Sequence, residues 1–329
     1  MAILTSLKNR LMQAGPDSFV LLLAFRLQAA VHGVSMHMSD GRIWLVRGPR
    51  RIILGARDVI SVPFVVHEWN QFFETIEGTV RDGRTVLDFS EPGLHRYRKH
   101  GLSFYAPSLA EDDSMEAYTA GYSPQPGDVV WDVGAHAGMT AYFLAQMVGP
   151  AGRVYAFEPD ETNYQFLLRN IEMHRLANIV PVKAALSDKT GTASFCMDGT
   201  MSAGLSDSLS YSAAGNARMV VTLSLRDACE QFGAVPNYIK MDIEGAELCV
   251  VRSSVDFLMK HPIHLSIESN HLVGGKFTAG PLETLLDRAG YRAWSSDKFG
   301  QLFTWAEPPA TLTKTPASCP LGCAGNIRS

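Results

Sequence analysis

The chain has few cysteines and no long apolar run, which argues against a disulfide-rich secreted protein and against a transmembrane protein. Its five cysteines are an odd number scattered through 329 residues, unlike a disulfide scaffold. The longest apolar run near the amino terminus, residues 19–25, is far below the ~20 residues that span a bilayer. We therefore expect a cytoplasmic protein with no transmembrane segment, in which an N-terminal amphipathic helix packs on the protein or contacts a membrane peripherally.

The sequence also has little excess charge of either sign. It holds 29 basic and 33 acidic side chains, for a formal net charge of -4. This balance gives no electrostatic footprint for nucleic acid, so we expect a small-molecule or glycan partner and no nucleic acid. Residues 1–110 are nevertheless basic, with 13 Lys or Arg against 9 Asp or Glu. That excess would suit an anionic or phosphate-bearing partner or a membrane surface, although a solvated charged face is the commoner explanation.

A third absence concerns glycine spacing. Residues 129–131 form a short apolar run typical of a strand, Gly134 and Gly138 bracket a tight turn, and residues 140–147 predict a helix. A second strand, residues 153–157, leads into Glu158. A dinucleotide-binding turn needs G-x-G-x-x-G, and no G-x-G occurs in this turn, which disfavours a nicotinamide cofactor.

S-adenosylmethionine suits this turn better because it carries no phosphate. Its ammonium and carboxylate fit an acidic side chain and turn amides near a helix N-terminus, which Asp132 and the Gly134 turn would supply. Glu158, at the tip of the next strand, could accept both hydroxyl hydrogens of a ribose. The alternative is an ordinary buried strand, turn and helix with incidental glycines.

The chain then continues with alternating strands and helices. We expect a loop over residues 185–188 beside the adenine and a hairpin-like insert over residues 191–221. The other expected elements are a helix over residues 161–175, strands over 178–182 and 263–268, a strand running into a helix over 238–247, a helix over 281–289, and a closing strand pair over 291–294 and 301–305. This alternation predicts an α/β fold whose mostly parallel sheet is covered on both faces and binds ligands at the carboxyl ends of its strands.

Four sequence blocks resemble a known family when they are taken together. VVWDVGAHAG, FEPD, AALSD and IKMDIEGAE resemble the FkbM family of S-adenosylmethionine-dependent O-methyltransferases, over roughly residues 124–307. The resemblance implies a Rossmann-like, seven-stranded, doubly wound class I methyltransferase sheet. The family usually has asparagine at the position of His136, and we expect the turn to be kept because both residue types are enriched at positive φ.

The turn and the resemblance together define the expected cofactor site, in which Asp132, Glu158 and the loop of Asp188 hold S-adenosylmethionine. The expected cofactor-binding residues are Asp132, Gly134, His136, Gly138, Glu158, Pro159, Ser187 and Asp188.

Methyl transfer requires alignment of the nucleophile and removal of one proton. Alignment in a dry pocket can supply about 7–11 kcal/mol, whereas a general base adds about 10²- to 10⁴-fold in rate. On an extended strand Lys240, Asp242 and Glu244 would point to one side. Asp242 is the first candidate for the base or the acceptor anchor and Glu244 the second, with Lys240 tuning their ionisation. The alternative is a structural ion pair of Lys240, with Glu244 and Glu247 favouring the next helix N-terminus.

Two further candidates follow the fifth strand on the same rim of the sheet. Glu268 ends that strand, and His271 has an intrinsic pKa suited to proton transfer near neutral pH, although a lone loop histidine is more often solvated or packed. Asp242, Glu244 and Glu268 could instead gather a divalent cation through oxygen ligands. Because no distinctive metal spacing is present, we expect S-adenosylmethionine as the cofactor and no metal site.

The N-terminal part follows a different pattern. Residues 35–80 contain short apolar runs broken by Asp40-Gly41 and Gly48-Pro49, which predicts a small β unit, then a helix over residues 67–78 and a strand over 84–89. We expect an α+β region at 1–123 that serves as acceptor platform, lid or packing surface. A methyltransferase domain at 124–310 and a flexible tail at 311–329 would follow, with Tyr118 and Tyr122 near the cofactor entrance.

The predicted function is O-methylation of a hydroxyl on a sugar, glycolipid or polyketide-type natural product, with the preference for oxygen coming from the resemblance. One alternative is an NAD(P)-dependent Rossmann oxidoreductase. The other is a non-catalytic module that keeps the cofactor pocket, and the acidic set of Asp132, Glu158 and Asp242 argues against it. The sequence indicates no oligomeric state.

Overall fold

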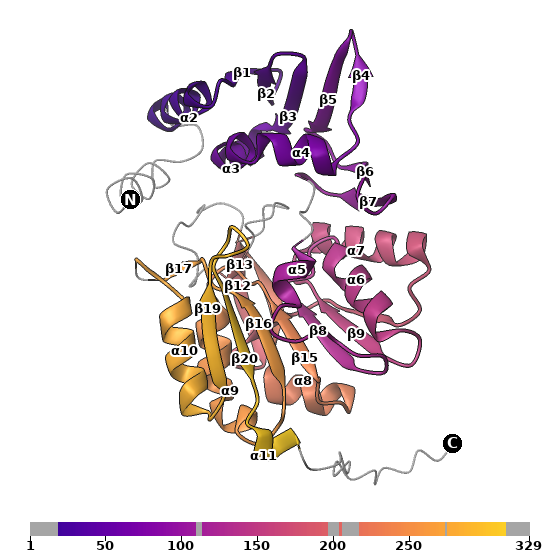
Figure 1. The fold of residues 1–329 in the computed structure, drawn as a ribbon, viewed down its shortest axis with the longest axis vertical. Helices are drawn as coiled ribbons and strands as arrows, with labels where there is room; N and C mark the ends of the chain where they lie inside the picture. The colour runs from indigo at the N-terminus through magenta and orange to yellow at the C-terminus, as the bar shows by residue number, and fades with distance from the viewer. Residues whose placement is uncertain (1–18, 110–113, 197–203, 206–216, 274, 314–329) are drawn as a thin grey trace.

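The computed structural model describes residues 19–109, 114–196, 204–205, 217–273 and 275–313. Figure 1 shows a smaller N-terminal unit, in indigo and purple, above a larger α/β unit that runs from magenta to yellow. No helix within the described ranges combines the length and apolar character needed to cross a membrane. Most of the tail predicted at 311–329 lies outside the described residues, and a short helix, α11 (Ala310–Thr313), overlaps its start.

The N-terminal unit is a five-stranded sheet with helices packed against it. Helix α2 (Phe19–Val31) precedes the strands. The sheet order is β1-β2-β3-β5-β4, with β1 (Ser35–Ser39), β2 (Arg42–Arg47), β3 (Arg50–Gly55), β4 (Thr79–Arg81) and β5 (Arg84–Phe89). Asp40 and Gly41 both have positive φ, as a two-residue type I′ turn requires, so the predicted hairpin is confirmed.

One part of the N-terminal prediction is wrong. The apolar residues after β3 do not continue as strands but form a 3-10 helix, η1 (Ala56–Ser61), followed by α3 (Val62–His67) and α4 (Trp69–Thr75). Pro63 lies in the first turn of α3, where its missing N–H costs nothing and its fixed φ favours a helix. Val65 and Val66 are buried there, so the run is apolar because it forms a core helix.

A hairpin joins the two units. It consists of β6 (Gly93–Tyr97) and β7 (Leu102–Ala106). The Phe104 ring lies 5.4 Å from that of Tyr142 on helix α6 (Met139–Val148) of the larger unit, and Met139 of that helix belongs to the N-terminal core. The two units therefore share a packed apolar contact.

The larger unit contains a seven-stranded sheet in the order β10-β9-β8-β15-β16-β20-β19. The strands are β8 (Val129–Val133), β9 (Arg153–Phe157), β10 (Ile179–Val182), β15 (Tyr238–Met241), β16 (His264–Glu268), β19 (Arg292–Ser296) and β20 (Phe303–Glu307). Neighbouring strands are parallel except at β20, which runs antiparallel to both β16 and β19. The predicted α/β class is confirmed.

Helices cover this sheet on both sides (Figure 1). They are α6 (Met139–Val148), α7 (Glu161–His174), α8 (Leu225–Phe232), α9 (Glu247–Leu258) and α10 (Ala279–Arg288), with the short α5 (Met115–Tyr118) preceding β8. Helix α7 begins at a capping residue, Asp160, whose side chain accepts from the Asn163 amide at 3.0 Å. The central strands are mostly apolar on both faces, as the buried Trp131 and Phe157 show, because both faces of the sheet are covered.

Two smaller sheets flank the ends of these strands. One has the order β11-β14-β12-β13, with β11 (Ala185–Ser187), β12 (Gly191–Cys196), β13 (Gly204–Leu205) and β14 (Ala217–Ser224). The other is the pair β17 (Leu272–Val273) and β18 (Lys276–Phe277). The segment predicted as a loop beside the adenine is therefore mainly a strand, because residues 185–187 pair with β14.

Candidate active site

The candidate residues gather at the carboxyl edge of the large sheet. Glu158 follows β9, Asp242 follows β15 and Glu268 ends β16, so the three carboxylates share one rim. Tyr122 lies elsewhere, because its ring stacks on His264, the first residue of β16, at 3.9 Å. The expected place of Tyr122 near the cofactor entrance is therefore wrong.

The turn after β8 has the backbone shape that its glycines require. Gly134 has φ 83°, and a Cβ there would lie 1.8 Å from the carbonyl oxygen of Asp242. Gly138 has φ 89°, and a Cβ there would lie 2.5 Å from Leu167. His136 has φ 47°, which confirms that histidine adopts the positive φ expected at this turn. The first turn thus packs directly against the loop that carries Asp242.

Glu158 is held in place by the same turn. It is buried, its Oε2 accepts from the His136 amide and its Oε1 from the Asp160 amide, both at 2.8 Å. Burial raises the pKa of Glu158 to about 7, although His136 and the two amides oppose that rise. Each carboxylate oxygen keeps a further lone pair, so Glu158 can still accept from the hydroxyls of a nucleoside. Pro159 follows it and leads into the cap of α7.

Asp132 has a different place from the one expected. It is fully buried, and its Oδ1 lies 3.0 Å from Nζ of Lys240, which also donates to the Gly134 carbonyl at 2.7 Å. The buried pair thus supports the backbone of the Gly134 turn, and the expected contact of Asp132 with a cofactor stays a prediction. Lys240 likewise does not line one continuous strand face with Asp242 and Glu244, because β15 ends at Met241.

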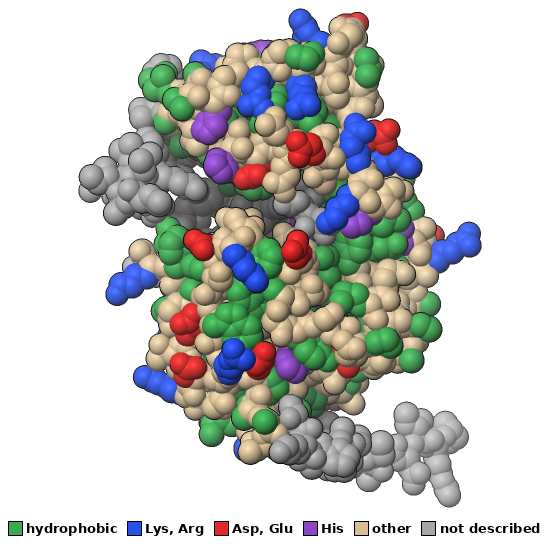
Figure 2. All heavy atoms as spheres, in the orientation of Figure 1, with side chains coloured by type: hydrophobic (Ala, Val, Ile, Leu, Met, Phe, Trp, Pro, Cys, Tyr) green, Lys and Arg blue, Asp and Glu red, His purple; other side chains and the backbone are tan. Residues whose placement is uncertain are grey.

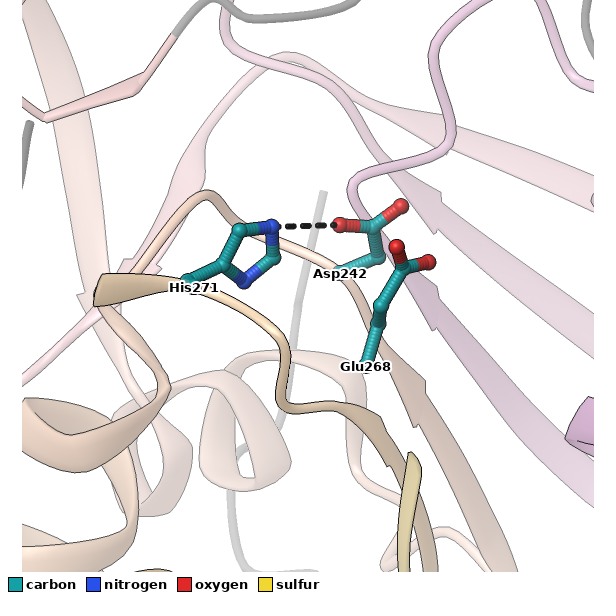
Figure 3. A group of neighbouring side chains, drawn as sticks. All are labelled: Asp242, Glu268 and His271. Carbon is teal, nitrogen blue, oxygen red and sulfur yellow. Dashed lines mark ion pairs between the residues drawn. The ribbon is translucent and has the colours of Figure 1, made fainter. Parts of the chain in front are cut away.

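A compact group of ionisable side chains surrounds His271 (Figure 3). Its Nε2 lies 3.7 Å from Oδ1 of Asp242 and 3.5 Å from Oε2 of Glu244. Its Nδ1 lies 3.0 Å from Oε1 of Glu247. Glu268 points toward the same space from the end of β16. The structure thus brings together four of the five predicted catalytic residues, with Lys240 in the layer beneath.

The charges in this group perturb one another. Burial, followed by the opposing charge of His271 and the like charge of Asp242, leaves the pKa of Glu244 raised to about 8. Burial and the like charge of Asp242 also raise the pKa of Glu268 to about 8. Burial alone would lower the pKa of His271, but the hydrogen bond and charge of Glu247, with the other carboxylates, raise it well above its ordinary value. Near neutral pH the group therefore holds an imidazolium and carboxyl groups that gain or lose protons easily.

Three residues that support this group were not recognised in these roles from the sequence. The Tyr118 hydroxyl donates to Oε2 of Glu268 at 3.1 Å and lies 3.5 Å from Oδ2 of Asp242. Asn270 donates to Oε1 of Glu268 at 2.9 Å. Glu247 is fully buried, and its Oε1 also accepts from the Gly245 amide at 3.2 Å. Only Tyr118, by its place before β8, and Glu247, by its place in IKMDIEGAE, carried any signal in the sequence.

The remaining predicted residues lie on the first small sheet. Ser187 is buried at the end of β11, and its hydroxyl donates to Oδ1 of the exposed Asp188 at 3.1 Å. Their expected contact with an adenine stays a prediction.

Three of the ligating atoms are close enough together to hold a cation. One atom each from Asp242, Glu268 and His271 lies within 4.8 Å of the others. The sequence suggested Asp242, Glu244 and Glu268 as candidate cation ligands, and in the structure His271 takes the place of Glu244 in this set. Two oxygens and an imidazole nitrogen would suit Mn²⁺ or Zn²⁺.

Comparison with known proteins finds a family model that matches the segment carrying this site. Residues 132–293 match the model described as the methyltransferase FkbM domain. The resemblance to the FkbM family is confirmed. The matched segment includes both the Asp132 turn and the Asp242, Glu268 and His271 group, so the FkbM domain contains all the candidate catalytic residues.

Individual relatives match only in part. The 31-O-demethyl-FK506 methyltransferase FkbM of Streptomyces tacrolimicus is 40% identical over 86 residues, which are 26% of this chain and 32% of that protein. The hexuronic acid methyltransferase AglP of Haloferax volcanii is 27% identical over 133 residues, 40% of this chain and 52% of that protein. The chain therefore spans about half or less of these relatives. The crystal structure of methyltransferase FkbM from Methylobacillus flagellatus aligns with 89% of this chain and 60% of that one, at 14% identity and a TM-score of 0.42.

Proposed function

We propose that this protein is an S-adenosylmethionine-dependent O-methyltransferase that acts on a hydroxyl of a sugar, glycolipid or polyketide-type product. The observation that carries the proposal is the group of Asp242, Glu244, Glu268 and His271 at the carboxyl edge of the sheet, directly beside the Gly134 turn. The match to the FkbM domain and the names of the two curated relatives support the same chemistry.

The residues of the first turn fit the proposed cofactor. S-adenosylmethionine supplies the methyl group on a positively charged sulfur and needs no phosphate site. Glu158 would accept from the ribose hydroxyls, and the amides of the Gly134 turn would face the amino-acid end. Asp132 would act through Lys240, which holds the Gly134 carbonyl at 2.7 Å.

The acidic group would hold the acceptor hydroxyl and take its proton. A base works best when its pKa lies near the working pH, and Glu268, with a pKa raised to about 8, meets that condition. The backbone of Asp242 contacts the Gly134 turn, and Asp242 remains the first candidate to anchor or deprotonate the hydroxyl. The imidazolium of His271 would keep the neighbouring carboxylates from repelling one another.

The experiment compares Asp242→Asn with the wild type in two assays. Isothermal titration with S-adenosylmethionine should give similar affinities, because Asn keeps the shape and the backbone contact of residue 242. Mass spectrometry of sugar, glycolipid and polyketide acceptor pools should show a one-methyl gain with the wild type and a rate about 10²- to 10⁴-fold lower with the variant. The proposal fails if S-adenosylmethionine does not bind the wild type, or if NAD binds in its place.

A divalent cation is the alternative use of the same group. Asp242, Glu268 and His271 would hold it, and it would orient the acceptor oxygens and favour loss of the hydroxyl proton. Dialysis against a chelator, followed by the methyl-gain assay with and without Mn²⁺, separates the two. If turnover is unchanged after chelation, a carboxyl group acts as the base without a metal. If turnover is lost and Mn²⁺ restores it, the group binds a catalytic cation.

A further inference from the structure

Two arginines lie opposite each other in the N-terminal unit, far along the chain from the FkbM domain. Arg47 ends β2, Arg50 begins β3, and the exposed Gly48 and Pro49 form the turn between them. The two arginines are direct partners in the strand register. Like charges directly opposite across two strands destabilise a hairpin. Their placement is therefore unfavourable unless neighbouring groups or a bound anion offset the repulsion.

Neighbouring side chains hold both guanidinium groups in place. The Arg47 guanidinium lies 5.1 Å from the centre of the Trp69 ring, and that of Arg50 lies 5.0 Å from the centre of the Phe73 ring. Both donate to Oδ1 of Asn70, at 2.7 Å from Arg47 and 3.5 Å from Arg50. A neutral amide oxygen thus fixes their geometry without neutralising their charge.

The pair has no carboxylate partner among the residues that the structure describes. No described Asp or Glu oxygen lies within 4.0 Å of Arg47 or Arg50, whereas Arg42 on the same strand pairs with Glu91 at 3.9 Å. Burial and the charge of Arg50 lower the pKa of Arg47. Both side chains are only half-buried, and Asn70 is exposed, so solvent reaches the pair.

We propose that Arg47 and Arg50 form a binding site for the phosphate group of a phosphate-bearing ligand. Two pre-oriented guanidinium groups present several N–H donors in the fixed geometry that phosphate oxygens accept, and an anion would offset the repulsion that Asn70 leaves in place. The surrounding unit favours anions, because residues 1–110 carry the excess of basic side chains. Figure 2 shows several Lys and Arg side chains on this upper part of the molecule.

The test measures binding without cofactor or acceptor, so its result is independent of the proposed methyl transfer. Isothermal titration with inorganic pyrophosphate should show saturable binding to the full-length wild type. Arg47→Gln and Arg50→Gln should each weaken it about tenfold or more. Arg42→Gln is the matched control: it removes the same charge from β2, but from a guanidinium that already has a carboxylate partner, and should change the affinity less than twofold.

Asn70→Asp is the sharper variant because it leaves both arginines intact. Its carboxylate would offset one of the two positive charges and occupy guanidinium donors, so pyrophosphate binding should fall about tenfold or more while the thermal midpoint stays equal or rises. That result cannot come from misfolding. The proposal is overturned by two results together. Pyrophosphate either does not bind or binds the wild type and Asn70→Asp equally, and the vesicle assay described next shows no difference between the variants and the wild type.

Vesicle sedimentation separates a lipid phosphate from a soluble one. The wild type is mixed with phosphatidylcholine vesicles with and without phosphatidylglycerol. Binding only to phosphatidylglycerol vesicles, lost in Arg47→Gln and Asn70→Asp, assigns the site to a lipid headgroup. Saturable pyrophosphate binding without such vesicle binding assigns it to a soluble phosphate. If neither probe distinguishes the variants from the wild type, the site does not exist.

Discussion

Glu268→Gln should stabilise the cofactor-free protein at alkaline pH. Burial and the charge of Asp242 raise the pKa of Glu268 from 4.5 to about 8. A carboxyl group whose pKa is raised by folding stabilises the folded state while it is protonated. That contribution is complete below the unfolded pKa and is lost as the pH rises from about 4.5 through about 8. The wild type should therefore lose stability over this window.

The magnitude follows from the size of the pKa difference. Each pKa unit corresponds to about 1.4 kcal/mol, so the full difference amounts to roughly 4–5 kcal/mol. The variant does not gain all of this energy, because Glu244, whose pKa is raised partly by the charge of Glu268, ionises more easily once residue 268 is uncharged. We expect about 2 kcal/mol of added stability for Glu268→Gln at pH 8 and little difference at pH 5.

The amide can also keep the local hydrogen bonds. Its oxygen can accept from the Tyr118 hydroxyl, as Oε2 of Glu268 does now at 3.1 Å. Its NH₂ group would face Asn270, whose Oδ1 is buried and accepts no hydrogen bond from the described residues. A rotation of the Asn270 amide would bring that oxygen to the new donor. The variant therefore removes a charge without leaving a new unpaired group.

Urea denaturation at pH 5 to 9 measures this effect. Glu161→Gln is the control, because Glu161 is an exposed glutamate paired with Lys183 at the start of α7. The control should change stability by less than about 0.5 kcal/mol at every pH, since exposed ion pairs contribute little. If Glu268→Gln destabilises the protein equally at pH 5 and pH 8, repulsion among the carboxylates does not govern this site.

Three further outcomes follow from the same geometry. Asp132→Ala should destabilise the protein by about 3–5 kcal/mol in urea titrations, because it leaves the buried Lys240 charge unpaired; a cost below about 1 kcal/mol would contradict the ion pair. Gly134→Ala should abolish S-adenosylmethionine binding in calorimetry, because a Cβ at φ 83° would lie 1.8 Å from the Asp242 carbonyl oxygen, and wild-type affinity would show that the turn does not form the site. Methyl transfer should rise with pH to a midpoint near 8 as Glu268 loses its proton, so a flat profile from pH 6 to 9 would exclude it as the base.

Local patterns predicted the elements of the large sheet well. The apolar run before Gly134, which ends at a tight glycine turn, predicted a strand, and the alternation that followed predicted the α/β class. Asp40-Gly41 predicted its hairpin for a local reason, namely the positive φ of both residues. Residues 62–67 lay within the predicted small β unit but form a helix, because a buried helix and a buried strand are equally apolar over six residues, and only Pro63 indicated the difference.

The sequence predicted which residues belong to the site, but it did not predict which of their side chains contact one another. The side-chain period of two placed Lys240 with Asp242, yet that period applies only while the strand lasts, and β15 ends between them. The chain then turns through Glu244 at φ 56°, which no local pattern indicated. Lys240 consequently faces Asp132 on the neighbouring strand, a contact that depends on which strands lie side by side.

Glu247 shows why a residue of the same motif can belong to the site without facing the acceptor. Its Oε1 accepts from the amides of Ile243 and Gly245, at 3.0 and 3.2 Å, so the loop that carries Glu244 is tied to the first turn of α9. The same oxygen lies 3.0 Å from Nδ1 of His271. A hydrogen bond there leaves Nε2 of His271 as the nitrogen that faces Asp242 and Glu244. One buried carboxylate therefore fixes both the loop after β15 and the imidazole after β16, and this joint anchoring explains how the loops that follow two neighbouring strands form a single group.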